Sequence, residues 1–401
     1  MTTDVIVIGG GMAGLCAAIA ARREGAVVRL VEAAPHAMRG GNLRHARNIR
    51  IPHEAPHYLS PGVYGCSEFA REMREISGGG GDPELIDAVS AQAGELATWL
   101  PEQGVVFQTR HIPFSRRTAF FLGGGKAVTN ALYARAEKLG VDIEYDAAVH
   151  GFDILKPPAR AVVLCCGGGQ ASASQRFINR GTPFNTGFLM ENLIRSGAAT
   201  TGDATVAHLV AIDARSPAHD GGIVTRIDGM QFGMVVDRAG QRFVEEETIT
   251  GSRRYPIWGK TIADLPVPQA TLVVDADGMQ SMPVLAFSPL RAETLADMAV
   301  IIGVDPSALA KSAGDCGRVR RGPFFSYPIT PGITFSCLGL QVDRSARVKM
   351  RDGAVLQNVF AAGATMAAGV LRTGYLSGTA LTISAVFGRI AGQEAARHAH
   401  G

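Results

Sequence analysis

The first hydrophobic segment of the chain is a short apolar run that ends abruptly in glycine. The β-branched residues from Val5 to Ile8 predict a strand, and three consecutive glycines follow them. A stretch of small residues with helical character comes next, and then a second strand pattern from Val27 to Glu32. The pattern predicts a strand, a tight turn, a helix and a second strand.

The turn in this unit has the spacing of a dinucleotide-binding fingerprint. Gly9, Gly11 and Gly14 form G-x-G-x-x-G, and Glu32 ends the next strand near the ~20-residue spacing that the fingerprint expects. Gly9 permits the tight turn, Gly11 lets the backbone approach a pyrophosphate, and Gly14 lets the helix pack closely on the strand. The pyrophosphate binds N–H groups at the helix N-terminus. Glu32 accepts hydrogen bonds from ribose hydroxyls and disfavours a 2′-phosphate.

Three later segments repeat a glycine turn next to apolar patterns. FFLGGGKAVTNALYARAEKLG leads into a helix and then a strand pattern at 141–145, and ARAVVLCCGGG predicts a buried parallel strand. The last segment predicts a strand, a glycine turn and a long helix from about Gly378, whose N-terminus would stabilise negative charge on a bound ligand. Glycine turns also have an ordinary structural use, but four in one chain favour one shared ligand.

The segment after Glu32 bears on which dinucleotide binds. HAMRGGNLRHARNIR inserts Gly40, Gly41 and Asn42 in a basic, hydrogen-bonding stretch where a nicotinamide enzyme would run into its third strand. A long buried cofactor with a polar ring edge needs such groups, so the segment favours FAD. The alternative is a basic surface loop.

Composition narrows the class of protein and its partners. The 401 residues carry a formal net charge of +3 without a long Lys/Arg run, so we expect no nucleic-acid partner. No stretch approaches the ~20 apolar residues that span a bilayer. The six cysteines form no CxxC pair and no zinc-type spacing, and glycines interrupt the apolar N-terminal stretch, which disfavours a signal peptide. We therefore expect a reduced, soluble, cytoplasmic protein without a metal site.

Several longer stretches resemble one enzyme family. They are RGGNLRHARNIR, RRTAFFLGGGKAVTNALY, RGTPFNTG, DGGIVTR, RRYPIWG, YPITPGITFSCLGLQVD and the closing AAG…GYLSG…FGRIAG. The chain is similar to flavoproteins of the fumarate reductase/succinate dehydrogenase superfamily, above all to the FAD-dependent tricarballylate dehydrogenase group and the related flavoprotein part of aerobic precorrin-3B synthase. The resemblance implies an α/β fold with a discontinuous Rossmann-like FAD-binding domain, residues 1–198 and 322–401. An α+β capping domain is then inserted at 199–321.

The resemblance also implies, residue by residue, which positions contact FAD. They are Gly9, Gly11, Ala13, Gly14, Glu32, Gly40, Gly41, Asn42, Gly124, Gly125, Lys126, Gly167, Gly363 and Gly378. Some members of the superfamily bind FAD covalently through a His directly after the position of Asn42. Leu43 stands there in this chain, so we expect non-covalent FAD.

Two positions depart from the fumarate reductase pattern. The His that those enzymes place before a G-G-V turn is Phe335 here, and the late Arg that grips a substrate carboxylate falls at about Tyr375. A Tyr also occurs there in the ketosteroid dehydrogenase branch. The capping-domain Arg that donates a proton has no secure match, and Arg320 and Arg321 are its nearest candidates.

The candidate catalytic residues follow from the chemistry of oxidising a carbon next to a carboxylate. That reaction needs a base, a hydride acceptor and cations that hold the acid, and the planar fork of arginine suits the last role. The arginine candidates, each alternatively a surface ion-pair partner, are Arg117, Arg180, Arg226 and Arg254. Tyr375 is a candidate phenol near the flavin, with ordinary packing as its alternative, and His45 is a candidate proton acceptor. His208 faces the cleft or is an ordinary, partly buried His.

The main hypothesis is an FAD-dependent dehydrogenase that desaturates a small polycarboxylate such as tricarballylate. Electrons would pass to a membrane-bound iron–sulfur or haem partner, since no second dinucleotide fingerprint is present. Tyr375 and the absent His suggest an alternative, oxidation of a larger ring substrate such as a precorrin or a steroid-like enone. Shortened segments after Val149 and before Tyr327 suggest a third, a flavin-binding partner subunit without turnover.

Overall fold

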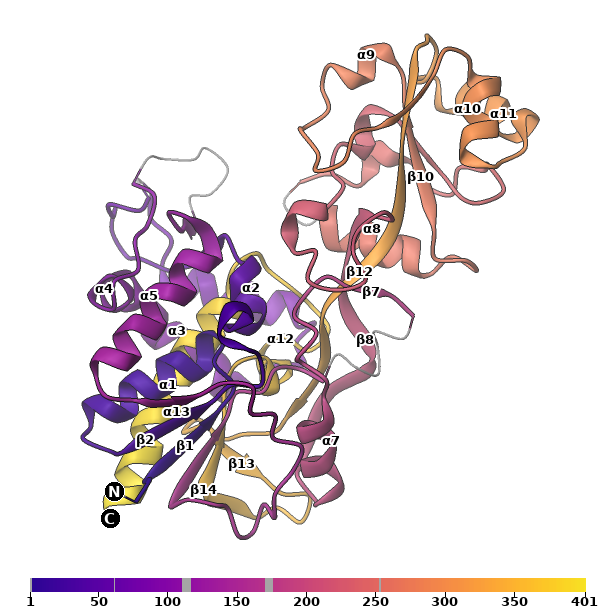
Figure 1. Ribbon diagram of the computed structural model, residues 1–401. Coiled ribbons are helices and arrows are strands. Elements are labelled where there is room, and N and C mark those ends of the chain that lie inside the picture. Colours follow the sequence, from indigo (N-terminus) through magenta and orange to yellow (C-terminus); the bar gives the residue numbers. More distant parts are fainter. Residues whose placement is uncertain (1, 61, 110–116, 170–175, 252–253) are drawn as a thin grey trace. The chain divides into compact units, whose positions relative to one another are not determined.

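The computed structural model describes residues 2–60, 62–109, 117–169, 176–251 and 254–401 (Figure 1). The chain forms two compact units. Unit 1 consists of residues 1–173, 182–208 and 335–401, and unit 2 of residues 174–181 and 209–334. The main segment of unit 2, residues 209–334, begins and ends later in the chain than the predicted capping segment 199–321. Unit 2 also includes the earlier residues 174–181. The domain limits 1–198, 199–321 and 322–401 stay a prediction.

Unit 1 is built on a six-stranded sheet with the order β13-β14-β6-β1-β2-β5. β1 (Val5–Ile8) lies between β2 (Val28–Val31) and β6 (Ala161–Leu164) and is parallel to both. Beyond them are β5 (Asp142–Glu144) and β14 (Val355–Ala361), also parallel to their neighbours, and the antiparallel edge strand β13 (Arg347–Lys349). The predicted strands are confirmed within a residue or two. The carboxyl ends of the parallel strands meet at one edge of the sheet, where open α/β sheets bind ligands.

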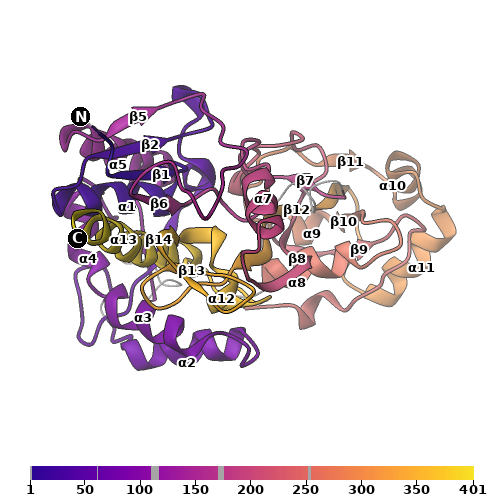
Figure 2. The same ribbon diagram turned by 90° about the horizontal axis from the view of Figure 1, so that it is seen from below.

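The two ends of the chain build this unit together. α1 (Met12–Arg23) packs against α13 (Thr379–His400), and both Figure 1 and Figure 2 show the indigo and yellow helices side by side. A Cβ on Gly388 would lie 2.4 Å from the Ala13 carbonyl oxygen, and one on Gly392 would lie 2.2 Å from that of Ala17. The helices therefore touch backbone to backbone. The discontinuous α/β fold predicted from the sequence is confirmed.

The other elements of unit 1 surround this core. α5 (Gly124–Lys138) packs on α1, and β3 (Asn48–Arg50) pairs with β4 (Thr118–Phe120) in a small antiparallel sheet. Among the described residues of unit 1, the other helices are α2 (Cys66–Ile76), α3 (Pro83–Ala93), α4 (Leu96–Glu102), α7 (Phe188–Arg195) and α12 (Ala368–Leu371), and the 3-10 helices are η1 (His36–Met38), η2 (Gly41–His45) and η6 (Gly363–Thr365).

Unit 2 is a sheet with a hydrophobic cluster on each face. Its strands have the order β11-β12-β10-β9, with β7 (Ile178–Asn179) and β8 (Thr200–Asp213) also paired to β12. Along β10 (Ala270–Val274), Leu272 packs with the Trp258 cluster and Val273 with the Met298 cluster, as strand alternation requires. The other elements are η3 (Ile223–Thr225), η4 (Met230–Phe232), β9 (Met234–Val236), η5 (Glu246–Thr248), α8 (Arg254–Ala263), α9 (Ala276–Met279), β11 (Leu290–Ala292), α10 (Leu295–Ile302), α11 (Pro306–Cys316) and β12 (Phe324–Leu340).

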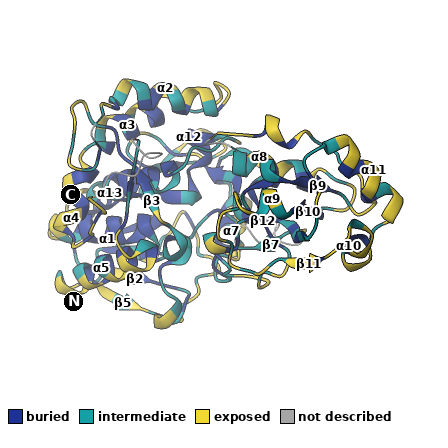
Figure 3. Ribbon diagram, turned by 90° about the horizontal axis from the view of Figure 1, so that it is seen from above, coloured by how far each residue is buried: buried dark blue, intermediate teal, exposed yellow. Residues whose placement is uncertain are grey.

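The distribution of burial follows these layers. In Figure 3 the central strands and α13 are largely dark blue, whereas α11 shows yellow exposed turns. The chain passes between the units within β8, after His208, and within β12, after Thr334. Within the described residues, no helix is both long and apolar enough to cross a membrane.

Candidate functional site

The loop between β1 and α1 forms a cradle of backbone N–H groups. Gly9 has a φ of 100°, a left-handed conformation that favours glycine. A Cβ on Gly14 would lie 1.8 Å from the Gly9 carbonyl oxygen, so only glycine permits this approach of helix to strand. Gly11 is the N-cap of α1 and has no side chain to satisfy the N–H groups of the first turn. Those groups are available to an anion such as a pyrophosphate.

Glu32 follows β2 at the same edge of the sheet, and its side chain is tied to both neighbouring glycine segments. The residue is only 5% exposed. Its Oε1 accepts a hydrogen bond from the Ala34 N–H at 3.0 Å. Its Oε2 accepts from the N–H groups of Gly10 at 3.2 Å and Gly40 at 3.3 Å. The acid is therefore held in one orientation beside the cradle.

The predicted segment Gly40–Asn42 packs against the start of α5. Gly40 and Gly41 have φ values of 101° and 54°, and η2 begins at Gly41. A Cβ on Gly125 would lie 1.9 Å from the Leu43 carbonyl oxygen. The Asn42 Oδ1 accepts from the Thr182 N–H at 2.9 Å, which links η2 to a third part of the chain.

The structure therefore brings Gly40, Gly41 and Asn42 together with Gly124 and Gly125. Gly124 has a φ of 65° and begins α5. Lys126, the third residue of that helix, is exposed, and its predicted contact with FAD stays a prediction.

The remaining predicted glycines lie at the ends of β6 and β14 and at the start of α13. Gly167 has a φ of 87° and packs against the amide group of Asn185. A Cβ on Gly363 would lie 2.8 Å from the Cβ of Ala13, so these two predicted contacts are direct neighbours. Gly378, with a φ of 83°, caps α13 and likewise has no side chain to satisfy its first turn. Two glycine-capped helix N-termini, those of α1 and α13, thus belong to the same compact unit.

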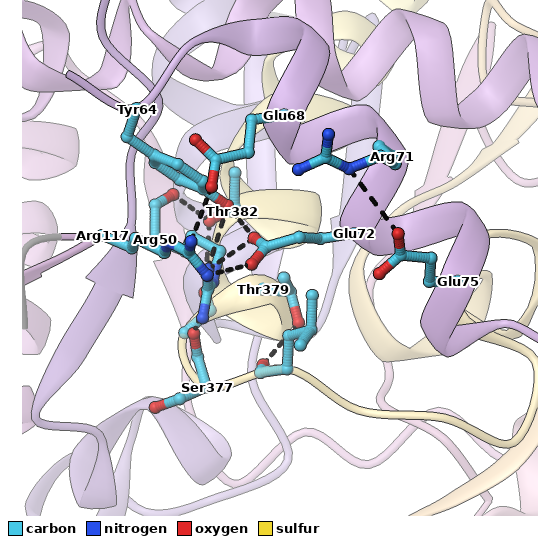
Figure 4. Close-up of polar contacts among 12 residues, drawn as sticks. Arg50, Tyr64, Glu68, Arg71, Glu72, Glu75, Arg117, Ser377, Thr379 and Thr382 are labelled. Atoms are coloured by element: carbon cyan, nitrogen blue, oxygen red, sulfur yellow. Dashed lines mark hydrogen bonds and ion pairs between the residues drawn. The ribbon is translucent and has the colours of Figure 1, made fainter. Parts of the chain in front are cut away.

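A buried network of charged groups supports the turn before α13 (Figure 4). The Arg50 Nε donates to the Ser377 carbonyl oxygen at 3.0 Å. Its Nη1 donates to the Tyr64 hydroxyl at 2.9 Å and to the Glu72 Oε2 at 2.8 Å. Burial raises the pKa of the Tyr64 phenol, which stays protonated and donates to Glu72. A Cβ on Gly378 would lie 2.6 Å from the backbone nitrogen of Arg50, so the strand that carries Arg50 also packs directly on this turn.

Arg117, predicted to clamp a substrate carboxylate, belongs to this network in the structure. Its guanidinium donates to Glu72 and, through Nη2, to the Glu68 Oε1 at 2.6 Å (Figure 4). Glu68 and Glu72 lie one turn apart on α2, so the helix presents both carboxylates on one face. A substrate acid would have to share the guanidinium with these two carboxylates, and the clamp role of Arg117 stays a prediction.

Tyr375 lies in an aromatic stack that the sequence did not predict. The His208 ring is 4.1 Å from the Tyr375 ring and 5.2 Å from the Phe335 ring, centroid to centroid. Phe335 and Tyr375 are 5.7 Å apart. His208 is only 8% exposed. The three residues come from β8, from β12 and from the turn before α13, and nothing in their local sequence links them.

The other candidate residues lie elsewhere. His45 ends η2 and is partly buried. Arg180, in unit 2, follows β7, and its backbone N–H donates to the Ile333 carbonyl oxygen at 3.1 Å. Arg226 and the Arg254 Nε, the latter at 2.9 Å, both donate to Asp228 in unit 2.

Arg320 and Arg321, the nearest candidates for the proton donor, are exposed, and Arg321 pairs with Asp277 at 2.6 Å.

Comparison with known proteins assigns the chain to a family. The family described as FAD binding domain matches residues 4–150 and 153–381. A fumarate reductase (cytochrome) of Shewanella frigidimarina is 24% identical over 99% of this chain and 77% of its own length. The chain belongs to this family of FAD-binding flavoproteins.

Solved structures share the fold. The open conformation of a flavocytochrome c3 fumarate reductase covers all of this chain, with 79% of its own length matched, 21% identity and a TM-score of 0.81. A 3-ketosteroid-Δ4-(5α)-dehydrogenase from Rhodococcus jostii covers 98% of this chain, with 97% of its own length matched, 22% identity and a TM-score of 0.72.

The residues of unit 1 fit FAD, and the predicted cofactor is confirmed. The glycine cradle leaves no room for a Cβ at Gly14, and the buried acid Glu32 stands where a ribose binds. The Gly378-capped N-terminus of α13 offers N–H groups to an electron-rich ring. The protein is an FAD-dependent oxidoreductase.

Proposed function

We propose that the protein oxidises or reduces a carbon–carbon bond next to the carbonyl group of a ring substrate. The main support for this proposal is the packing of the His208, Phe335 and Tyr375 rings against one another in unit 1. The fumarate reductase pattern has a His at the first aromatic position, Phe335, and an Arg at about the position of Tyr375. Apolar rings and a phenol suit an enone better than a free acid.

The chain's own groups account for the polar part of such a reaction. The Tyr375 phenol donates a hydrogen bond to the substrate carbonyl and stabilises the negative charge that develops on its oxygen. His208 packs on the phenol ring and restricts its orientation, and the Phe335 ring lies beside both of them. Bound FAD, held by the residues of the cradle, supplies the two-electron acceptor or donor.

Anaerobic flavin spectroscopy tests this proposal. The FAD-loaded protein, chemically reduced, is mixed with 2-cyclohexenone or 4-androstene-3,17-dione and, separately, with fumarate. We expect the enones to reoxidise the flavin and fumarate to leave it reduced. Reoxidation by fumarate alone would favour a polycarboxylate as the substrate. If neither class changes the flavin spectrum, the protein is better described as a flavin-binding partner subunit without turnover.

The role of Tyr375 has its own prediction. Tyr375→Phe should slow flavin reoxidation by an enone about 100-fold, the usual cost of removing one preorganised donor, without changing FAD affinity. Tyr58→Phe is the matched control, because Tyr58 is exposed and its hydroxyl donates to the Ala97 carbonyl oxygen at 3.0 Å. Equal rates of flavin reoxidation in the two variants would contradict the role of Tyr375 as a hydrogen-bond donor to the substrate.

A second candidate, desaturation of a tricarballylate-like polycarboxylate, is supported by the arginines of unit 2. Arg226 and Arg254 share the single carboxylate of Asp228, which leaves one net positive charge for a substrate acid. On this reading, Arg254→Gln should raise the KM for the acid about tenfold, as expected for one lost hydrogen bond to a charged group. Arg291→Gln, at an exposed Arg291–Glu293 pair, is the control and should leave KM unchanged.

We further propose that electrons are exchanged with a membrane-bound iron–sulfur or haem partner. The Shewanella relative is a fumarate reductase (cytochrome), which supports a haem partner. Six free cysteines agree with a reducing, cytoplasmic location, which is also a proposal. Co-purification of the tagged protein with a haem-absorbing membrane fraction tests the partner, and recovery of the protein alone counts against it.

A further inference from the structure

A buried tyrosine from α5 contacts the acid that ends β2. Tyr133 is 1% exposed, and its hydroxyl donates to the Glu32 Oε2 at 3.2 Å. Burial and the neighbouring Glu32 carboxylate raise the pKa of the Tyr133 phenol, so it stays protonated and remains a donor.

This contact explains the middle glycine of the cradle. A Cβ on Gly10 would lie 1.9 Å from the Tyr133 hydroxyl and 2.8 Å from the Glu32 Oε2. Gly10 occupies a position that the G-x-G-x-x-G fingerprint leaves open to other residues. Glycine is needed here because the phenol and the carboxylate fill the space of a side chain.

The hydrogen bonds of Glu32 are divided unequally between its two oxygens. Oε2 accepts from Tyr133 and from the N–H groups of Gly10 and Gly40, which fills its acceptor positions. Among the described residues, Oε1 accepts from Ala34. One acceptor position at Oε1 is therefore left for a ligand.

Two further buried donor atoms lie next to the same tyrosine. The Tyr145 ring, directly after β5, is 5.9 Å from the Tyr133 ring, and the Arg39 guanidinium lies 4.9 Å from the Tyr133 centroid. Within the part of the chain that the structure describes, the Tyr145 hydroxyl and the Arg39 Nε are buried and make no hydrogen bond. Buried donors of this kind are normally paired, so a ligand is their natural partner.

We propose that Tyr133 is a positioning residue that saturates the Glu32 Oε2 and presents Oε1 to the adenosine ribose of FAD. The Tyr145 hydroxyl and the Arg39 Nε complete this adenosine site. The proposal concerns the nucleotide end of the cofactor and is independent of the substrate. A failed assay with enones therefore leaves it standing.

Binding of ADP, which has the adenosine and pyrophosphate of FAD without the flavin, tests the proposal. Calorimetry on the flavin-free protein gives the Kd of FAD and of ADP for Tyr133→Phe and Tyr145→Phe. We expect both ligands to bind about tenfold more weakly, by the same factor, in each variant. Tyr58→Phe is the control and should change neither Kd.

Weaker FAD binding with unchanged ADP binding would overturn the assignment, as would no change in either. Tyr145→Phe keeps the test decisive if Tyr133→Phe does not fold, because the Tyr145 hydroxyl has no partner within the described residues.

A double-mutant cycle separates positioning from simple packing. Gly10→Ala alone should weaken ADP binding, because its Cβ collides with the Tyr133 hydroxyl. In the Tyr133→Phe background that atom is gone, so Gly10→Ala should have a smaller effect on the Kd. Purely additive effects of the two changes would contradict the proposed contact.

Discussion

At the scale of single residues, the cradle between β1 and α1 has no space for a Cβ at Gly9, Gly10 or Gly14. A Cβ on Gly14 would lie 1.8 Å from the Gly9 carbonyl oxygen, a backbone atom that cannot move aside. Gly14→Ala should therefore destabilise the protein by about 1–3 kcal/mol, the usual cost of overpacking, and weaken FAD binding. Urea unfolding and flavin titration measure the two effects.

Gly314→Ala is the matched control for this prediction. Gly314 lies within α11, is exposed and would have nothing within 4 Å of an added Cβ. Alanine there should be neutral or stabilising by about 0.5–1 kcal/mol, because glycine is a poor helix former. Equal losses of stability in the two variants would show that the close approach of Gly14 to the Gly9 carbonyl oxygen does not affect stability.

Buried thiols give a second prediction at this scale. Burial raises the pKa of Cys16 and of Cys337 to about 12 in each case. Both thiols are therefore protonated at pH 8, and only the thiolate reacts. We expect both to remain unmodified by iodoacetamide in the native protein and to react after unfolding in urea. Peptide mass spectrometry checks this, and fast native labelling of Cys16 would contradict its burial.

At the scale of elements, α2 and β3 are joined to the turn before α13 by buried charges. Glu72 and Arg50 have side chains 12% and 9% exposed, and Glu72 also receives Arg117 and Tyr64. Glu72→Gln should lower the free energy of unfolding by about 3 kcal/mol or more, because it leaves buried cations without their anion. Glu75→Gln, on the same helix at an exposed pair with Arg71, should change it by less than about 0.5 kcal/mol.

Because that network contacts the turn at Ser377 and Gly378, its loss should also change the environment of the bound flavin. Glu72→Gln is expected to shift the absorbance spectrum of bound FAD, and Glu75→Gln is not. If Glu72→Gln lowers stability and leaves the spectrum unchanged, the network stabilises the fold but does not position the turn at the flavin.

At the scale of the whole molecule, the predicted FAD contacts all lie in unit 1, although they come from both ends of the chain. FAD at about 100 times its Kd should stabilise that unit by about 2.7 kcal/mol. Hydrogen exchange should then slow in β1, α1, α5 and α13, while α10 and α11 of unit 2 exchange at unchanged rates. Uniform slowing across both units would show that they open together.

Much of the fold followed from the sequence because its signals are local. A strand that ends at Gly9, a helix after Gly11 and an acid at Glu32 lie within one short segment, and their spacing predicts their geometry. The discontinuous α/β domain also followed, through the resemblance of the closing segment to a known family. The sequence did not reveal that Arg117 pairs with Glu68 and Glu72, because these partners come from a helix far away in the chain, and its clamp role stays a prediction.

By itself, the sequence determined where the parallel strands end and which backbone positions must be glycine, and therefore the cofactor. These properties depend on residues close together in the chain, where spacing alone sets distance. Only the tertiary structure decided that His208 stacks on Phe335 and Tyr375, and that Tyr133 fills the space above Gly10. Such contacts join remote segments, and no local periodicity records which of them folding brings together.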